Sequence, residues 1–421
     1  MLDTGFAHDP SLPEPIPGSE ALEVTADDFR DGFGEPLSKT LDLETWTTGE
    51  DLASVYGRIE AEVRGAVAQE NQVRAEIRKR VFPLLGTYPA SPAGAGVYSA
   101  DLDHLHRVHR GLLFNGGVEA CDGTQQVHDT LPLTILQVGI SLVSYQGHQG
   151  TWGHRLFRRD LRVASGDPTQ EMLELLERRE RRGGLNHSSR RDALSELARR
   201  GIMAYGERAI LLRRSTAPWR MGHGNPAPYE LITGSGSLDL MIEATKVIRE
   251  LVEHHQKFVF VSSEPSDRVL LTIGQALFPL EFAVVGTLKE RIEKTVQGGH
   301  YRGNVTVDCR WDGSELTAER WIKRFCDDVA SQVVVGVFRA TELAPAQMFF
   351  AHRDHADLAA HIALADSVLQ AHRGFPLLID LADSVCHGVF GGDTLSGPVT
   401  AAYADAGAPW RYLSERATRR G

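Results

Sequence analysis

The chain has few cysteines and no long hydrophobic run. Its 421 residues contain four cysteines, and no two of them form a CxxC pair: Cys121, Cys309, Cys326 and Cys386. We therefore expect neither a disulfide framework nor a structural zinc site, and a reducing cytoplasm is the predicted location. No apolar stretch approaches the ~20 residues of a membrane helix. The acidic start MLDTGFAHDP lacks the basic and apolar regions of a secretory signal, so no membrane association is expected.

Several catalytic motifs are also missing. The chain contains no GxxxxGK[ST] phosphate-binding loop, so we do not expect it to hydrolyse ATP. It has neither the GxSxG turn of α/β-hydrolases nor the HExxH motif of zinc proteases. These absences exclude three common classes of hydrolase and turn attention to the carboxylates.

The negative charge is concentrated at the amino terminus. Twelve acidic and two basic residues give the first 50 residues a net charge of −10, out of −11 for the whole chain. Proline and glycine interrupt residues 1–47, which we interpret as an extended, flexible acidic arm. The rest of the chain is nearly neutral, which argues against a protein whose whole surface binds the phosphates of nucleic acid.

Apolar spacing predicts an α/β fold with a mixed sheet. Strands are expected at 118–122 and 133–145, around a polar turn DGTQQVHD, and at 257–261, 282–288, 304–310, 332–339 and 346–351. Helices are expected at 50–80, 170–182, 190–213, 237–255, 356–372 and 376–386, with a loop at 87–98 and a hairpin-like segment at 226–236. The predicted division is an arm at 1–47, a helical segment at 48–110, an α/β domain at 111–395 with a helical insertion at 166–214, and a tail at 396–421.

Four carboxylates stand at the ends of these elements. Asp122 follows an apolar strand and precedes Gly123, and Glu264 comes just after the strand at 257–261. Glu243 lies near the start of the helix at 237–255, and Asp383 lies in the last predicted helix. Carboxylates that share one site repel each other unless a cation lies between them, and oxygen ligands suit Mg²⁺ or Mn²⁺. Two such ions would activate water for phosphodiester cleavage.

The order of three short motifs resembles the NurA nuclease family. VEACDGT is similar to the family's strand ending in Asp-Gly-Ser/Thr, FAVVGTLK to its vvGvvK strand, and GFPLLIDLAD to its last motif GYPxPLxxAH. The resemblance covers roughly residues 110–390. It implies a ribonuclease H-like mixed sheet flanked by helices, with metal-binding Asp122 and a functional lysine at Lys289.

The chain departs from the family pattern at two places. Where the family has Leu-Asp-Gly-Ser, the chain has Val261-Ser262-Ser263-Glu264, so that Glu264 would have to replace the missing aspartate. Asp383 stands where the family has histidine, and aspartate is also a metal ligand of ribonuclease H-like nucleases. The family's helix glutamate falls on Glu243 or on Glu250, one face of the same helix, and we prefer Glu243 because it is nearer the strand ends.

The resemblance implies a metal-dependent deoxyribonuclease that uses Mn²⁺ or Mg²⁺, with a two-metal site held by Asp122, Glu264 and Asp383. It also implies a homodimer that receives DNA from a hexameric HerA-type ATPase, in DNA end processing or in defence against phage. The acidic arm and the missing phosphate-binding loop fit a subunit that relies on its partner both for ATP hydrolysis and for holding the DNA. The alternative is a degenerate ribonuclease H-fold subunit that scaffolds the translocase without cutting, which the lost aspartate favours.

Overall fold

The computed structural model describes residues 26–46, 48–49, 56–89, 91–130, 132–159, 169–170, 172–173, 196–263, 267–297, 306–311, 313–409 and 411–412. The chain divides into two compact units, Met1–Glu70 and Asn71–Gly421. Among the described residues, no helix is long and apolar enough to cross a bilayer.

The first unit is helical where it is described. It contains α1 (Ala26–Phe33), α2 (Leu37–Leu41), a 3-10 turn η1 (Leu43–Thr45) and the first part of α3 (Tyr56–Arg80). The rings of Phe29 and Phe33, one turn apart on α1, lie 4.7 Å from each other. The side chain of Asp42 accepts a hydrogen bond from the Glu44 amide and caps η1. Two helices and a capped turn therefore occupy part of the segment that the sequence predicts as extended.

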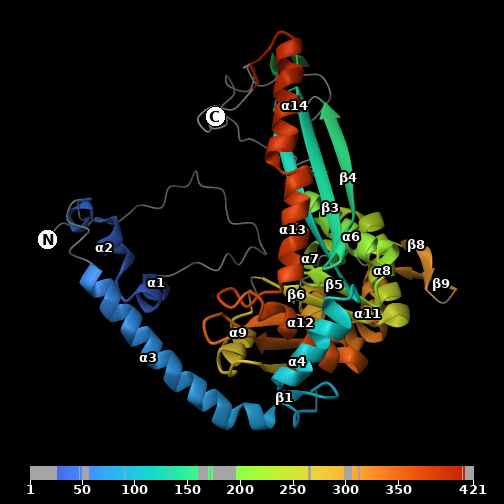
Figure 1. Ribbon diagram of the computed structural model, residues 1–421. Coiled ribbons are helices and arrows are strands. Elements are labelled where there is room, and N and C mark those ends of the chain that lie inside the picture. Colours follow the sequence, from blue (N-terminus) through green and yellow to red (C-terminus); the bar gives the residue numbers. More distant parts are fainter. Residues whose placement is uncertain are drawn as a thin grey trace. The chain divides into compact units, whose positions relative to one another are not determined.

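The described part of the second unit is built on a nine-stranded mixed sheet in the order β1-β7-β10-β11-β6-β5-β2-β3-β4 (Figure 1). Its strands are β1 (Gly96–Ser99), β2 (Val118–Asp129), β3 (Leu133–Ser144), β4 (Gly147–Arg159), β5 (Trp219–His223), β6 (Phe258–Ser262), β7 (Glu281–Thr287), β10 (Val333–Arg339) and β11 (Gln347–His352). Among these described strands, only the β2–β5 and β5–β6 pairs are parallel. Three antiparallel strands, β4-β3-β2, followed by two strands parallel to β2, form the ribonuclease H-like mixed sheet that the sequence predicts.

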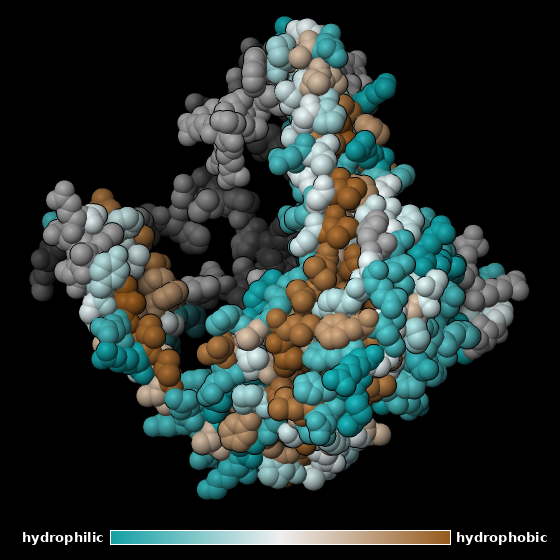
Figure 2. Space-filling model, viewed as in Figure 1, coloured by the Kyte–Doolittle hydropathy of each residue, from teal (hydrophilic) through white to brown (hydrophobic). Residues whose placement is uncertain are grey.

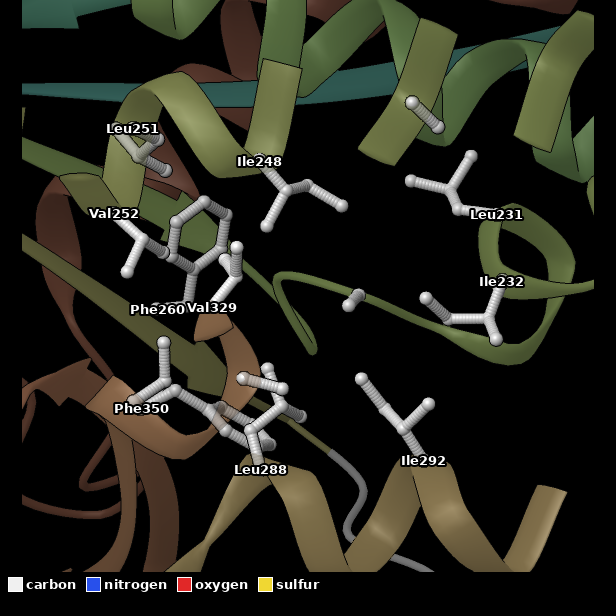
Figure 3. Close-up of a cluster of buried hydrophobic side chains, with 14 of the residues drawn as sticks. Leu231, Ile232, Ile248, Leu251, Val252, Phe260, Leu288, Ile292, Val329 and Phe350 are labelled. Atoms are coloured by element: carbon white, nitrogen blue, oxygen red, sulfur yellow. The ribbon is translucent and has the colours of Figure 1, made fainter. Parts of the chain in front are cut away.

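Helices cover both faces of the sheet, and strands such as β6, β10 and β11 are accordingly buried along nearly their whole length. One face carries α6 (Glu196–Arg214), α7 (Tyr229–Ile232), α8 (Leu238–Glu250), α9 (Arg268–Gln275), α10 (Leu288–Gln297) and α11 (Ala318–Asp328). Figure 3 shows part of this core, where Ile248 and Phe260 lie among side chains from α7, α10 and β11. The other face carries α4 (Leu102–Val108), α12 (Ala356–Ser367) and α13 (Leu377–Phe390).

The long strands β2, β3 and β4 carry α13 and the following α14 (Gly392–Asp405) along one side (Figure 1). Their contact depends on two glycines. Gly139 of β3 pairs with Gly153 of β4, and a Cβ added at either position would lie 2.2 Å or 2.4 Å from the ring of Phe390. The Gln137 side-chain amide donates to the Phe390 carbonyl at 2.9 Å. Phe390 is therefore held between two positions that have no side chain.

Replacing Gly139 with alanine should destabilise the second unit by about 1–3 kcal/mol, because the methyl group would overlap the Phe390 ring. The denaturation midpoint in urea measures this effect. Gly388→Ala on α13 is the matched control, since a Cβ there meets nothing within 4 Å. A Gly139→Ala protein as stable as the wild type would mean that Phe390 does not pack here.

Most predicted strands are confirmed, and the errors have identifiable causes. The expected polar turn DGTQQVHD is the outer half of β2, which pairs with β3 as far as Asp129. The expected hairpin at 226–236 is instead α7 and a 3-10 turn η5 (Gly234–Gly236). Strands β1, β4 and β5 escape sequence-based prediction because glycine, histidine and arginine interrupt their apolar pattern. A short separate hairpin comprises β8 (Thr306–Trp311) and β9 (Ser314–Thr317).

The boundaries of the predicted segments also differ from the elements of the structure. Strand β1 places part of the expected helical segment 48–110 in the sheet. Helix α14 continues past residue 395, where a tail is expected to begin.

Candidate active site

Asp122 is a buried carboxylate in the middle of the sheet. The parallel pairing of β2 with β5 joins residues 118–121 to 219–222, so Asp122 is the first residue beyond it. Its antiparallel partner on β3 is Ser141, and its exposed fraction is 4%. The sequence-based expectation of a sharp turn at the sheet edge is therefore wrong. Asp122 nevertheless lies level with the carboxyl end of β5, where open α/β sheets place their ligands.

His223 ends β5 and reaches Asp122. Its Nδ1 lies 3.2 Å from Asp122 Oδ1, and its Nε2 lies 2.9 Å from the Ser263 hydroxyl, just beyond β6. Burial alone would lower the pKa of His223, but the hydrogen bond to Asp122 and the charges of Asp122 and Glu207 outweigh it and raise the pKa. The imidazole thus links Asp122, inside β2, to the carboxyl ends of β5 and β6, and it favours its charged form.

Glu207 approaches Gly123, the neighbour of Asp122, from α6, which packs on β2 and β3 on the face of the sheet opposite α13. A Cβ added at Gly123 would lie 2.7 Å from Glu207 Oε1, so glycine next to Asp122 makes room for this carboxylate. Burial raises the pKa of Glu207 to about 7, the ion pair with Arg208 opposes the rise, and the charge of Asp122 adds to it. The site therefore contains two buried carboxylates that repel each other.

Arg208 connects Glu207 to the loop after β5. Besides its ion pair with Glu207, the buried guanidinium donates to the carbonyl oxygens of His223 at 3.2 Å and Asn225 at 2.5 Å. It also donates to the carbonyl oxygens of Ala204 and Pro226. One side chain thus fixes both the helix glutamate and the loop that begins at His223.

Asp383 completes the set from α13. The Ser141 hydroxyl, opposite Asp122 in the sheet, donates to the Ala382 carbonyl and so fixes the residue before Asp383. Burial and the charge of Asp122 raise the pKa of Asp383, while His387, 3.7 Å away, opposes the rise. The structure therefore brings Asp383 into the electrostatic field of Asp122.

The chemistry of these groups fits a divalent cation. The charge of Asp122 acts on the other two carboxylates and contributes to the raised pKa values of Glu207 and Asp383. A cation between them would relieve that repulsion, and carboxylate oxygens are ligands of Mg²⁺ and Mn²⁺. As placed, each carboxylate has a basic partner instead, and no three possible ligands of the described residues lie close enough together to hold a metal.

Three other residues that the sequence analysis selects lie elsewhere. Glu243 is exposed and pairs with Lys246 at 2.6 Å. Glu250 pairs with Arg213 at 3.4 Å and acts on Arg220 near the start of β5, away from His223 at its end. Lys289 pairs with Asp327 at 2.6 Å. It follows β7, which runs antiparallel to β6, so that β7 ends on the side of the sheet where β6 begins. Glu264 lies outside the described residues.

Sequence reasoning misses Glu207 and His223. Glu207 belongs to a helix rich in charge, so it resembles a solvated residue. It nevertheless lies between Ala204 and Leu211, which are buried on α6 at helical spacing, and this is the signal that marks it as buried. His223 closes a five-residue strand that carries arginine and glycine, and no local pattern reveals it.

Comparison with known proteins finds similar solved structures. No family model and no curated protein matches the sequence. The structure is similar to the NurA nuclease from Sulfolobus solfataricus, with 8% identity, a TM-score of 0.42, and coverage of 83% of this chain and 98% of the other. A NurA structure bound to dAMP and manganese is also similar, with 10% identity, a TM-score of 0.40, and coverage of 84% of this chain and 97% of the other. Endonuclease V from Ciona intestinalis in complex with DNA has 11% identity, a TM-score of 0.23, and coverage of 64% of this chain and 84% of the other. NurA is also the family that the sequence motifs resemble.

Proposed function

We propose that the chain is a metal-dependent DNA nuclease whose active site is centred on Asp122. The observation that carries the proposal is the contact of buried Asp122 with His223 at the carboxyl end of β5, with Glu207 of α6 and Asp383 of α13 near enough for the charge of Asp122 to raise the pKa of each. Carboxylates whose pKa is raised by a neighbouring carboxylate are a recognised feature of catalytic sites. The manganese of one similar NurA structure and the DNA of the endonuclease V complex agree with the proposed cofactor and substrate.

Asp122 and Asp383 would hold Mg²⁺ or Mn²⁺ together with a further carboxylate, for which the sequence predicts Glu264 and the structure offers Glu207 near Asp122. The bound cation would supply a Lewis acid that activates water and stabilises the leaving oxygen. The chain's own residues set the conditions: Arg208 orients Glu207, Ser141 positions α13, and Ser263 holds the His223 ring. The His223 side chain is 33% exposed, so solvent reaches the imidazole beside Asp122.

The proposed partners are DNA, a second copy of the chain and a hexameric ATPase of the HerA type, and the proposed role is DNA end processing or defence against phage. The acidic first 50 residues support a protein partner over DNA for that segment. Figure 2 shows hydrophobic side chains on the surface around α13, where Leu381 and Val389 are 38% and 46% exposed. Exposed apolar residues of this kind support a protein contact there.

Cleavage of end-labelled single-stranded and double-stranded DNA by the purified chain tests the proposed function. Cutting should require Mn²⁺ or Mg²⁺ and stop with EDTA, with the ATPase partner added in a parallel series. If no metal supports cutting in either series, the nuclease proposal fails.

A second function is a ribonuclease H-fold scaffold subunit that does not cut. The observation that favours it is His223, because an imidazole paired with Asp122 adds positive charge where a further carboxylate would strengthen cation binding. Assembly with the ATPase without any cleavage would support the scaffold.

A further inference from the structure

The loop that joins α12 to α13 borders the candidate active site. We name residues 368–376 the α12–α13 loop. The ring of Phe375, near its end, lies 5.6 Å from the ring of His223, centroid to centroid, in an edge-on contact. The helix that begins directly after the loop carries Asp383. The loop therefore meets the site both at His223 and at the first turns of α13.

Neighbouring residues hold the backbone of the α12–α13 loop. The Gln347 side-chain amide donates to the Arg373 carbonyl at 3.3 Å. Gly374 has φ +58°, and a Cβ added there would lie 2.5 Å from the Cβ of Ala344, so glycine is required at this position. A backbone held in this way carries the Arg373 side chain, which is 61% exposed.

Arg373 is paired with the carboxylate one helical turn before Asp383. Its guanidinium donates to Asp380, which precedes Asp383 by three residues and is therefore its neighbour on the surface of α13. Burial and the charge of Asp122 raise the pKa of Asp383, and the charge of Asp380 adds to the rise. The side chain of Asp383 is 48% exposed. Arg373 and Asp383 are thus two exposed, oppositely charged side chains that both adjoin Asp380.

This arrangement leaves donors for a phosphate. Asp380 also accepts a hydrogen bond from the Gln370 side-chain amide at 2.5 Å, so this carboxylate is anchored independently of Arg373. Among the described residues, only Asp380 accepts a hydrogen bond from the Arg373 side chain. A guanidinium has five N–H donors in a fork that matches phosphate, so it can contact a carboxylate and a phosphate together. A phosphate beside these carboxylates needs such a cation, because the carboxylates repel it.

We propose that Arg373 binds a backbone phosphate of the DNA strand next to the bond to be cut, with Asp380 orienting its guanidinium. The inference rests on the proposed nuclease function, and it adds a group that positions the strand. A phosphate contact carries no sequence information, so Arg373 sets the register of the strand at the active site without selecting bases.

Equilibrium binding tests this contact without any need for cleavage. The anisotropy of a fluorescein-labelled oligothymidylate of about 20 nucleotides is measured with the full chain in Ca²⁺ and again in EDTA, over a range of salt concentrations. Arg373→Gln removes the charge, and Arg373→Lys keeps it. Arg353→Gln is the matched control, since Arg353 is 51% exposed, pairs with Asp354 at 3.8 Å and precedes α12 at the end opposite the loop.

A double-mutant cycle with Asp380→Asn separates a DNA contact from a structural role. If Arg373 only balanced the charge of Asp380, its replacement would have no effect once that charge is removed. A guanidinium that contacts phosphate matters in both backgrounds.

Arg373→Gln should bind the strand about tenfold more weakly than the wild type, with a salt dependence reduced by about one phosphate contact. The same change should weaken binding by a similar factor in the Asp380→Asn background. Arg373→Lys should keep most of the affinity, Arg353→Gln should bind as the wild type does, and circular dichroism should show all proteins folded.

Binding by Arg373→Gln within about twofold of its parent protein, in either background, would overturn the inference. A wild type that binds no strand would overturn it as well. A wild type that binds DNA through Arg373 but never cuts would refute only the nuclease function.

Discussion

The Asp122→Asn protein should lose about 10³-fold or more of its metal-dependent DNA cleavage. Asp122 is the carboxylate that acts on Glu207, His223 and Asp383 alike, so its charge is central to any cation site here. Asparagine has nearly the same size and keeps an oxygen for the His223 hydrogen bond, so the fold should be retained. The rate of single-turnover cleavage in Mn²⁺ measures the loss.

The control for this change lies on the same strand. Asp129, at the far end of β2, is exposed and accepts a hydrogen bond from the Thr134 hydroxyl at 2.6 Å. Asp129→Asn should cut at the wild-type rate. Undiminished cleavage by Asp122→Asn would remove the active site from this position.

Glu207→Gln should lower cleavage by at least about 100-fold, because it removes the second buried carboxylate of the site. The amide keeps an acceptor for Arg208, which also donates to four backbone carbonyls, so the protein should fold. The buried guanidinium loses its charged partner, however, and the free energy of unfolding should fall by about 1–3 kcal/mol. Cleavage rate and urea denaturation, measured on the same sample, separate the two effects.

Glu243→Gln is the matched control for Glu207. Glu243 is the helix glutamate that the sequence favours, but its side chain is 54% exposed and pairs with Lys246. Its replacement should leave both cleavage and stability within error of the wild type. The opposite result, an inactive Glu243→Gln and an active Glu207→Gln, would restore the sequence-based choice.

The contrast between these two glutamates shows what sequence patterns can predict. Apolar runs such as those of β6 and β10 predict strands because nearly every side chain in them is buried. Asp122 and Asp383 are predicted because each lies in an apolar segment, where a carboxylate is conspicuous. Glu207 lies among arginines and glutamates on α6, and only the burial of one helix face distinguishes it.

Strand pairing accounts for the remaining errors. Lys289 follows a strand of the expected pattern. The pairing of the strands in the sheet is what shows that β7 runs antiparallel to β6 and therefore ends where β6 begins. The sequence predicts a turn at Asp122, but its position beyond the end of the β5 pairing depends on a strand 101 residues further along the chain. Contacts of such long range leave no trace in local sequence.

Binding of Mn²⁺ itself is the most direct test of a cation site at Asp122. An electron paramagnetic resonance titration counts free Mn²⁺ in the presence of the wild type and of Asp122→Asn, without DNA and without any need for cleavage. We predict that the wild type takes up Mn²⁺ and that the variant binds it at least about tenfold more weakly, since a lost ligand costs at least as much as a lost partner of a ligand. Equal binding of Mn²⁺ by the two proteins would contradict the central claim.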